Sequence, residues 1–336
     1  MMPYIFFSVL VISFLLTGLL RWYAKARSII DIPNERSSHK IPTPRGGGVA
    51  VVITFLVTLC IFYIYELIEL NVFVALMGAG SLIAIIGFVD DHQHVPSRYR
   101  LLIHFISAIW LLAWIGVPRF ILGDYIVDSI WILAPLAAFY IVWLVNLYNF
   151  MDGIDGLASI ECITVCIYSA IILAVPEFGI SQWFLPVSFA MAVSGFLIWN
   201  FPPAKIFMGD AGSGFMGLIL GAFSVYFALD YPSLFWCWVI LLGVFTVDST
   251  FTLIRRVING EKFNEAHRSH AYQIASRKYN SHLLISFFVF VINTVWLLPI
   301  ALLVAFSIID GTTGFIIAYI PLILMAVHFQ AGLEDG

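Results

Sequence analysis

Long uninterrupted apolar stretches dominate this chain, and short polar segments separate them. The stretches do not alternate between polar and apolar positions, which favours membrane-spanning helices over the strands of a barrel. A helix needs roughly 20 apolar residues to cross a bilayer. Eleven stretches approach that length: 3–20, 46–66, 70–89, 101–117, 130–147, 159–175, 182–200, 214–230, 233–254, 283–306 and 311–329. The pattern predicts an all-α polytopic membrane protein with about eleven transmembrane helices.

The composition supports this class. Of the 336 residues, 62% are hydrophobic and 11% are charged, whereas a soluble domain is about half apolar and a quarter charged. A soluble fold and a disordered chain are both excluded. The chain has no basic stretch, so nucleic-acid binding is not expected. All four cysteines lie in apolar stretches, and we interpret them as packing residues.

The basic residues predict an orientation. When the loops are counted from the end of the first stretch, 15 of the 16 lysines and arginines fall in odd loops, and only Arg119 falls in an even one. The positive-inside rule makes the odd loops cytoplasmic. We therefore expect a periplasmic N-terminus, a retained first helix and a cytoplasmic C-terminus. We also expect one domain over 1–336, with cytoplasmic loops near 21–45, 90–100, 148–158, 200–213 and 255–282.

The first cytoplasmic loop is basic and rich in proline and glycine between Asp31 and Gly48, which disfavours a helix. Arg36, Lys40 and Arg45 can hold phosphate. They can equally contact anionic lipid head groups. The loop alone does not distinguish these interpretations.

Carboxylates gather in the next two cytoplasmic loops. Asp90 and Asp91 are adjacent at the end of a stretch, and a metal ion, a cationic side chain or a shared proton must relieve their repulsion. Asn149, Asp152 and Asp155 follow each other at intervals of three, so they would share one face if the segment is helical. Such a set suits a hard cation or a polyol.

A further acid, Asp210, opens an apolar stretch and is followed by Gly212, Ser213 and Gly214. No strand precedes this segment, so it is not a nucleotide-binding glycine loop. Asp210 can reach a metal ion, and the small residues can offer backbone donors.

The longest late loop carries His267, Arg268 and His270. Zinc is not expected because a third ligand is missing, and phosphate or nucleotide recognition fits better. Asp248 lies inside an apolar stretch, where an acid is either functional or part of a structural ion pair. The remaining histidines in or beside apolar stretches are interpreted as packing residues: His104, His282 and His328.

Four motifs in order now resemble a known family. They are Asp90-Asp91, the run from Asn149 to Gly156 that reads Asn-Phe-Met-Asp-Gly-Ile-Asp-Gly, the run from Phe207 to Gly214, and the histidine loop. Together they are similar to the polyprenyl-phosphate N-acetylhexosamine-1-phosphate transferases, or glycosyltransferase family 4. The first loop and the histidine loop most resemble bacterial enzymes that start O-antigen or other surface polysaccharides.

The resemblance implies a membrane reaction at the cytoplasmic face of the bacterial inner membrane. Such enzymes transfer a sugar 1-phosphate from a UDP-N-acetylhexosamine to undecaprenyl phosphate and release UMP. It implies Mg²⁺ or Mn²⁺, with Asp210 as the principal metal ligand and with Asp152 and Asp155 near the metal and the uridine diphosphate. It also implies that Asp90 and Asp91 deprotonate or position the lipid phosphate, and that Asn149 lies in the active site. His267 and His270 match the loop that contacts the nucleotide-sugar. From their types and positions, we also expect Ser213 and Arg268 to bind substrate.

Two departures and two alternatives remain. Arg100 stands where the family often has lysine, and arginine pairs with phosphate as a fork rather than a point charge. The His-Arg-Ser-His sequence argues against a muramoyl-pentapeptide substrate.

Direct attack by the lipid phosphate is favoured, but an aspartyl-phosphate intermediate is conceivable. The alternative function is a transporter that uses membrane carboxylates for ion or proton coupling. The sequence does not give the sugar, and a homodimer stays open.

Overall fold

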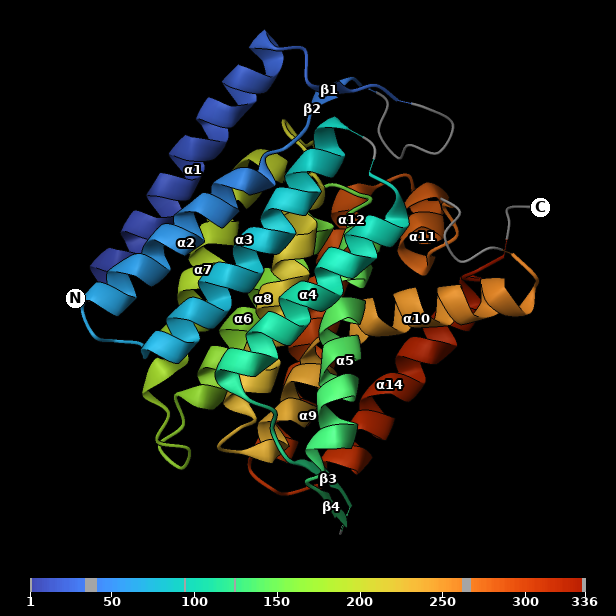
Figure 1. Ribbon diagram of the computed structural model, residues 1–336. Coiled ribbons are helices and arrows are strands. Elements are labelled where there is room, and N and C mark those ends of the chain that lie inside the picture. Colours follow the sequence, from blue (N-terminus) through green and yellow to red (C-terminus); the bar gives the residue numbers. More distant parts are fainter. Residues whose placement is uncertain (1, 34–40, 94, 124, 262–266, 334–336) are drawn as a thin grey trace.

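The computed structural model describes residues 2–33, 41–93, 95–123, 125–261 and 267–333. Helices make up most of it and stand side by side as a bundle (Figure 1). The helices are α1 Met2–Ala26, α2 Gly48–Ile64, α3 Leu70–His92, α4 Ser97–Ile115, α5 Ile130–Met151, α6 Leu157–Leu173, α7 Phe184–Asn200, α8 Asp210–Phe227, α9 Pro232–Leu241, α10 Gly243–Ile258, α11 Ala271–Tyr279, α12 His282–Ile292, α13 Leu298–Ala305 and α14 Gly311–His328.

Short irregular elements connect these helices. A 3-10 turn, η1 Ser181–Trp183, precedes α7, and a π-helical turn, η2 Asn293–Leu297, joins α12 to α13. Two small antiparallel hairpins complete the structure: β1 Ile30–Asp31 with β2 Thr43–Pro44, and β3 Phe120–Leu122 with β4 Tyr125–Val127. The first hairpin lies in the loop after α1, where proline and glycine disfavoured a helix.

The class of all-α polytopic membrane protein is confirmed. Within the described residues, eight helices are long and apolar enough to cross a membrane, and the bent pair α9–α10 would make a ninth. Each of the eleven predicted stretches contains a helix, but α2 and α6 have only 17 residues each. The count of eleven and the orientation of the termini therefore stay predictions.

The ninth apolar stretch departs from the expected single span. It breaks at Leu242, and α9 and α10 meet at an angle of 70°. Figure 1 shows α10 leaving the direction of the bundle. A break inside an apolar region needs partners for the freed backbone groups. Tyr319 of α14 provides one, because its hydroxyl donates to the Val239 carbonyl near the end of α9 at 2.9 Å.

Helix α8 lies at the centre of the bundle and packs against α2, α3 and α5. Nearly all of its side chains are buried. Gly48 and Gly212 bring α2 and α8 into backbone contact, since a Cβ atom on Gly48 would lie 2.5 Å from the Cα of Gly212. The central position of α8 fixes the residue at its start, Asp210.

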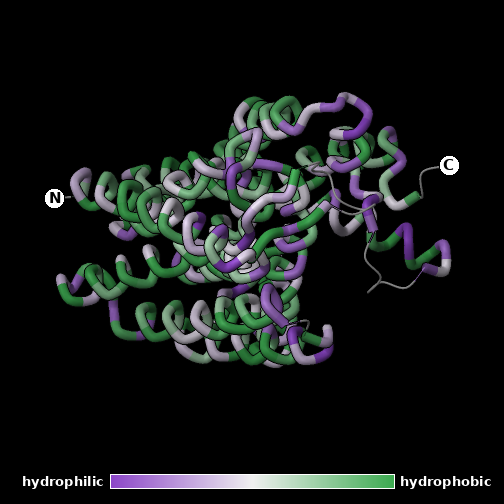
Figure 2. The backbone as a smooth tube through the Cα atoms, turned by 90° about the horizontal axis from the view of Figure 1, so that it is seen from above, coloured by the Kyte–Doolittle hydropathy of each residue, from purple (hydrophilic) through white to green (hydrophobic). Residues whose placement is uncertain are grey.

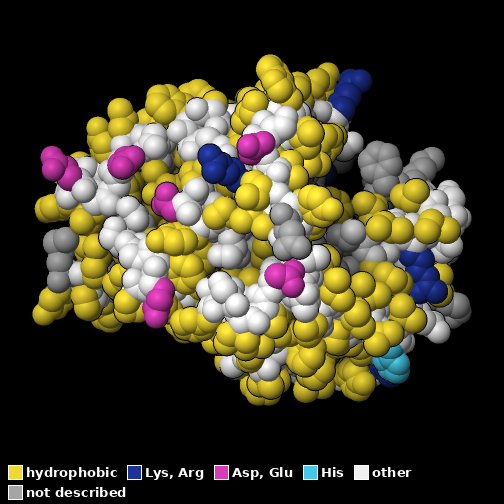
Figure 3. All heavy atoms as spheres, turned by 90° about the horizontal axis from the view of Figure 1, so that it is seen from below, with side chains coloured by type: hydrophobic (Ala, Val, Ile, Leu, Met, Phe, Trp, Pro, Cys, Tyr) yellow, Lys and Arg dark blue, Asp and Glu magenta, His cyan; other side chains and the backbone are white. Residues whose placement is uncertain are grey.

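The two ends of the bundle differ in polarity. Seen from the end where α3, α5 and α7 finish and α8 begins, the backbone carries several hydrophilic segments close together (Figure 2). The opposite face shows scattered acidic side chains among apolar ones (Figure 3). The functional candidates gather at the first of these two ends.

Candidate functional site: a polar cavity at one end of the helix bundle

Two loops far apart in the sequence form the base of the site. The Phe207 N–H donates to the Pro44 carbonyl at 2.8 Å, and the N–H groups of Gly47 and Gly48 donate to the carbonyls of Phe207 and Met208, each at 2.9 Å. This backbone pairing places Arg45, which follows β2, beside the first residue of α8.

Three carboxylates and two arginines meet there. Arg45 lies 3.0 Å from Asp91 through Nε and 2.5 Å from Asp210 through Nη2. Arg100 forms an ion pair with Asp90 and lies 3.2 Å from the second oxygen of Asp210. Of the three ways to relieve the repulsion between Asp90 and Asp91, the structure uses cationic side chains.

Asp91 also caps α8. Its two carboxylate oxygens accept the N–H groups of Asp210 at 2.9 Å and Ala211 at 3.3 Å. The preceding residue, Gly209, has φ +83°, and a Cβ atom there would lie 2.6 Å from Asp91 Oδ2. Only glycine allows this approach without strain. The side chain of Asp91 is 4% exposed, so it is a buried anchor for the start of α8.

The segment after α5 differs from the sequence-based interpretation. The helix ends at Met151, so Asn149, Asp152 and Asp155 do not share one helical face, and that interpretation is wrong. Asp152 begins a non-helical segment that ends at Gly156, whose φ is +75°. Asn149 donates from Nδ2 to the Ser213 hydroxyl at 3.2 Å, which ties α5 to α8.

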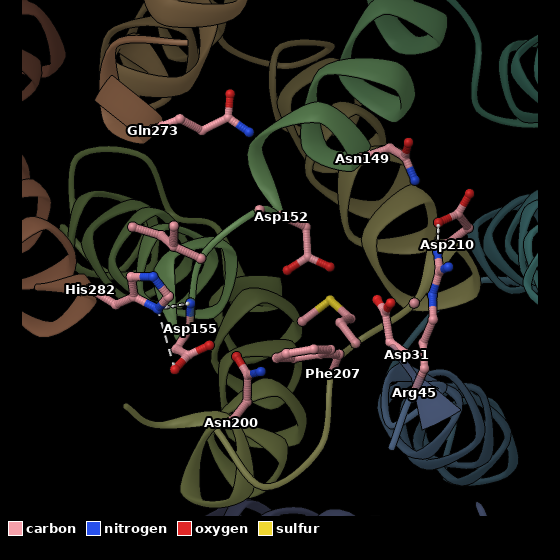
Figure 4. A pocket seen from close by; sticks show the side chains of 14 residues that line it. Asp31, Arg45, Asn149, Asp152, Asp155, Asn200, Phe207, Asp210, Gln273 and His282 are labelled. Carbon is pink, nitrogen blue, oxygen red and sulfur yellow. Dashed lines mark hydrogen bonds and ion pairs between the residues drawn. The ribbon is translucent and has the colours of Figure 1, made fainter. Parts of the chain in front are cut away.

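These elements enclose a polar cavity of about 250 Å³. Asp152 lies between two groups of side chains, with Arg45 and Asp210 on one side and Asp155 and His282 on the other (Figure 4). The other labelled lining residues are Asp31, Asn149, Asn200, Phe207 and Gln273. The cavity thus combines several carboxylates with one guanidinium and amide groups.

Asp152 points into this cavity, and its carboxylate has no hydrogen-bond or ion-pair partner among the described residues. Burial raises the pKa of Asp152 well above its usual range; Asp210, Asp91 and Asp155 act in the same direction, and Arg45 opposes them. A carboxylate in such surroundings is stabilised by an added positive charge. For Arg45 burial acts to lower the pKa, but Asp210 and Asp91 outweigh it and the pKa is raised.

The donor set fits a hard cation. No group of three or more His, Cys, Asp or Glu side chains within the described residues is arranged to hold a metal on its own. Mg²⁺, however, usually takes one or two carboxylates, together with water and substrate phosphate oxygens. The unpartnered carboxylate of Asp152 near Asp210 matches that requirement.

Asp155 connects three parts of the site. Its Oδ2 accepts the Ala204 N–H at 3.0 Å and lies 3.3 Å from His282 Nδ1. Its carbonyl accepts the Ser286 hydroxyl of α12 at 3.1 Å. The prediction that His282 is a packing residue is wrong, because this histidine lines the cavity.

The histidine loop does not line the cavity. His270 is buried, and its Nδ1 lies 3.3 Å from Asp248. Asp248 also accepts the N–H groups of Ala271 at 2.9 Å and Tyr272 at 3.0 Å, so it caps α11. These contacts of Asp248 join α10 to the start of α11. His267 lies beside His270, and burial lowers the pKa of His267 to about 3. Like His267 and His270, Arg268 is absent from the cavity wall.

Other predicted contacts have different positions from those expected. Ser213 is fully buried; its hydroxyl and its N–H both donate to the Gly209 carbonyl, so neither offers a free donor to a ligand. Arg36 and Lys40 lie outside the described residues. Sequence reasoning missed the cavity residues Asp31, Asn200, Phe207, Gln273 and His282. Of these, Asp31, Phe207 and Gln273 stood within motifs that drew attention.

A second, apolar groove of about 280 Å³ lies between α10, α11, α12 and α14. Tyr272 of α11 lines the groove, and the next residue, Gln273, lines the polar cavity. The Tyr272 hydroxyl donates to the Phe150 carbonyl at 2.9 Å. Helix α11 therefore separates a polar space from an apolar one.

Comparison with known proteins adds independent information. Residues 73–228 match glycosyl transferase family 4. The chain is 30% identical over 273 residues to the "probable undecaprenyl-phosphate N-acetylglucosaminyl 1-phosphate transferase" of Bacillus subtilis, which covers 77% of this chain and 72% of that protein. It is 28% identical to the undecaprenyl-phosphate alpha-N-acetylglucosaminyl 1-phosphate transferase of Thermotoga maritima, over 80% of both chains. It is 32% identical to the decaprenyl-phosphate N-acetylglucosaminephosphotransferase of Mycolicibacterium smegmatis, over 74% of this chain and 69% of that one.

Proposed function

Because this chain belongs to glycosyl transferase family 4 and is a phospho-sugar transferase, we propose that it transfers N-acetylhexosamine 1-phosphate from a UDP-N-acetylhexosamine to undecaprenyl phosphate. UMP leaves, and the product is the first lipid-linked intermediate of a surface polysaccharide of the O-antigen type. The observation that carries this proposal is the polar cavity at the ends of the membrane helices, where Arg45, Asp210 and Asp152 lie together. We place this cavity at the cytoplasmic face of the bacterial inner membrane.

The chain's own charges can gather two phosphate-bearing substrates. The guanidinium groups of Arg45 and Arg100 lie beside Asp210. A guanidinium group can bind two phosphate oxygens at once through two N–H donors. A magnesium or manganese ion held by Asp210 and Asp152 would offset the charge of the diphosphate. Asp210 and Asp152 contribute the negative charge that retains such an ion next to the two arginines.

The reaction is an in-line displacement at phosphorus. An oxygen of the lipid phosphate attacks the phosphorus attached to the sugar, and the bond to the bridging oxygen breaks. That oxygen leaves with UMP. The attacking phosphate is already an anion, so it needs no general base. Asp90 and Asp91 are engaged by Arg100, Arg45 and the start of α8, and we assign them the role of positioning these groups.

The acceptor also carries a long apolar chain, which needs an apolar surface. The groove lined by α10, α11, α12 and α14 offers one. Helices α11 and α12 each line both this groove and the polar cavity, so the two spaces are neighbours. A lipid whose chain lies in the groove can present its phosphate to the cavity around the end of α11.

The test is the nucleotide that purified protein releases from a panel of UDP-N-acetylhexosamines with undecaprenyl phosphate and Mg²⁺. We expect UMP, and only when both lipid and metal are present; the best donor names the sugar. Release of UDP would mean ordinary glycosyl transfer and would contradict the mechanism. The absence of any nucleotide from folded protein would reject the proposal. The transporter alternative gains no support, because the carboxylates that line the cavity lie together at one end of the bundle.

A further inference from the structure

His282 begins α12 and lines the polar cavity. Figure 4 shows it across the cavity from Arg45 and Asp210, with Asp152 between them. Its side chain is 19% exposed, so the ring lies in the wall rather than in the core of the bundle. The proposed phosphoryl transfer assigns no role to this histidine.

The contacts of the ring engage one of its two nitrogens. Nδ1 lies 3.3 Å from Asp155 Oδ2 and 3.5 Å from the Asp155 backbone N–H. Each ring nitrogen of a histidine is a hydrogen-bonding group, a donor or an acceptor according to where the proton lies. Within the described part of the chain, Nε2 has no hydrogen-bond partner.

A role that only holds the loop together does not explain this arrangement. Asp155 is already fixed by the Ala204 N–H on its carboxylate, at 3.0 Å, and by the Ser286 hydroxyl on its carbonyl, at 3.1 Å. These two bonds tie the loop to the α7–α8 connection and to α12. The contact between His282 and Asp155 instead orients the ring, which leaves Nε2 as the available group.

We propose that Nε2 of His282 forms a hydrogen bond with a polar group of the nucleotide-sugar donor that is remote from its phosphates. This inference rests on the proposed function. Arg45, on the other side of the cavity, attracts the phosphates, so a donor bound there extends toward His282. The bonded group is an amide, which both the base and the N-acetyl group of such a donor carry. Asp155 is the positioning residue that sets the orientation of the ring.

Two substitutions separate the nitrogens. His282→Asn places an amide near Nδ1, so it can keep the bond from Asp155 but has nothing at Nε2. His282→Gln can place an amide N–H near Nε2. We expect His282→Asn to raise the KM for the UDP-sugar about tenfold, the loss of one hydrogen bond, with kcat and the KM for the lipid unchanged. We expect His282→Gln to stay within about threefold of wild type. His328→Asn, at an exposed position in the last turn of α14, is the matched control.

Binding of UMP identifies the bonded group. If His282→Asn also weakens UMP binding, that group belongs to the base; if UMP binding is unchanged while the KM for the donor rises, it belongs to the N-acetyl group. Both results support the inference. A His282→Asn variant that matches wild type would overturn it, and so would equal losses in both variants with a lower thermal midpoint, which would indicate a purely structural role. Wild-type protein that releases no UMP would instead reject the proposed function.

Discussion

The buried carboxylate of Asp91 gives the most direct test of how the site is built. It accepts two backbone N–H groups at the start of α8 and pairs with Arg45. Removing it in Asp91→Ala leaves both N–H groups without a partner in a buried position, at a cost of about 1–3 kcal/mol each. Arg45 keeps its pair with Asp210, so its contribution to the loss is partial. Because these effects overlap, we expect the free energy of unfolding to fall by about 3 kcal/mol in total.

Asp91→Asn is the more informative variant. The amide oxygen can still accept one N–H of α8, but the amide nitrogen then faces a second donor, either Ala211 N–H or the Arg45 guanidinium. We expect the free energy of unfolding to fall by about 1–2 kcal/mol, roughly half of the decrease in the alanine variant. Turnover falls with stability in both variants, because Arg45 and Asp210 are displaced together.

The measurements are thermal midpoints of detergent-solubilised protein at one heating rate, because such unfolding is often irreversible, and release of UMP. Glu177→Gln, in an exposed loop at the other end of the bundle, serves as the control and leaves both unchanged. A thermal midpoint equal to wild type in Asp91→Asn, combined with complete loss of turnover, would refute the reasoning. Asp91 would then act as a chemical group rather than as a cap.

Three further predictions concern the charged groups of the site and the histidine loop. Asp210→Asn lowers turnover at least about 10²-fold with expression retained; activity near wild type would remove Asp210 from the metal site. Asp152→Asn raises the Mg²⁺ concentration for half-maximal activity at least about tenfold, measured by titrating metal into chelator-treated protein; an unchanged midpoint would exclude Asp152 as a ligand. Burial lowers the pKa of His267 to about 3, so below the ordinary value of about 6.5 the unfolded chain binds a proton that the folded chain does not. Stability therefore falls as the pH decreases from about 6.5, and His267→Gln flattens that dependence in thermal melts; an equally steep curve would contradict it.

The apolar pattern predicted the positions of the helices well, because a lipid environment allows a spanning segment few alternatives. It did not predict the break at Leu242. A residue that stabilises the break, Tyr319, lies in another helix. Hydropathy describes one segment at a time, so it cannot show a hydrogen-bond partner that another helix provides.

The chemistry of the site was only partly predictable for the same reason. Asp210, Asp152 and Arg45 were candidates because of their types and positions, and the structure brings them together. The sequence left three partners open for Asp90 and Asp91, and only the pairing of loops 165 residues apart shows that Arg45 is one of them. His282 carries no motif, and its place in the cavity wall follows from its contact with Asp155.

The backbone pairing between residues 44–48 and 207–208 has a consequence for how the protein is made. Arg45 leaves the ribosome 165 residues before Asp210, an interval of roughly ten to thirty seconds at 5–20 residues per second. Throughout this interval the guanidinium of Arg45 lacks the start of α8, and the carboxylate of Asp91 lacks it from its own synthesis onward, although both bind there in the finished protein. The site therefore closes only after the eighth helix has been inserted, so a stalled or truncated chain has several membrane helices but no assembled active centre.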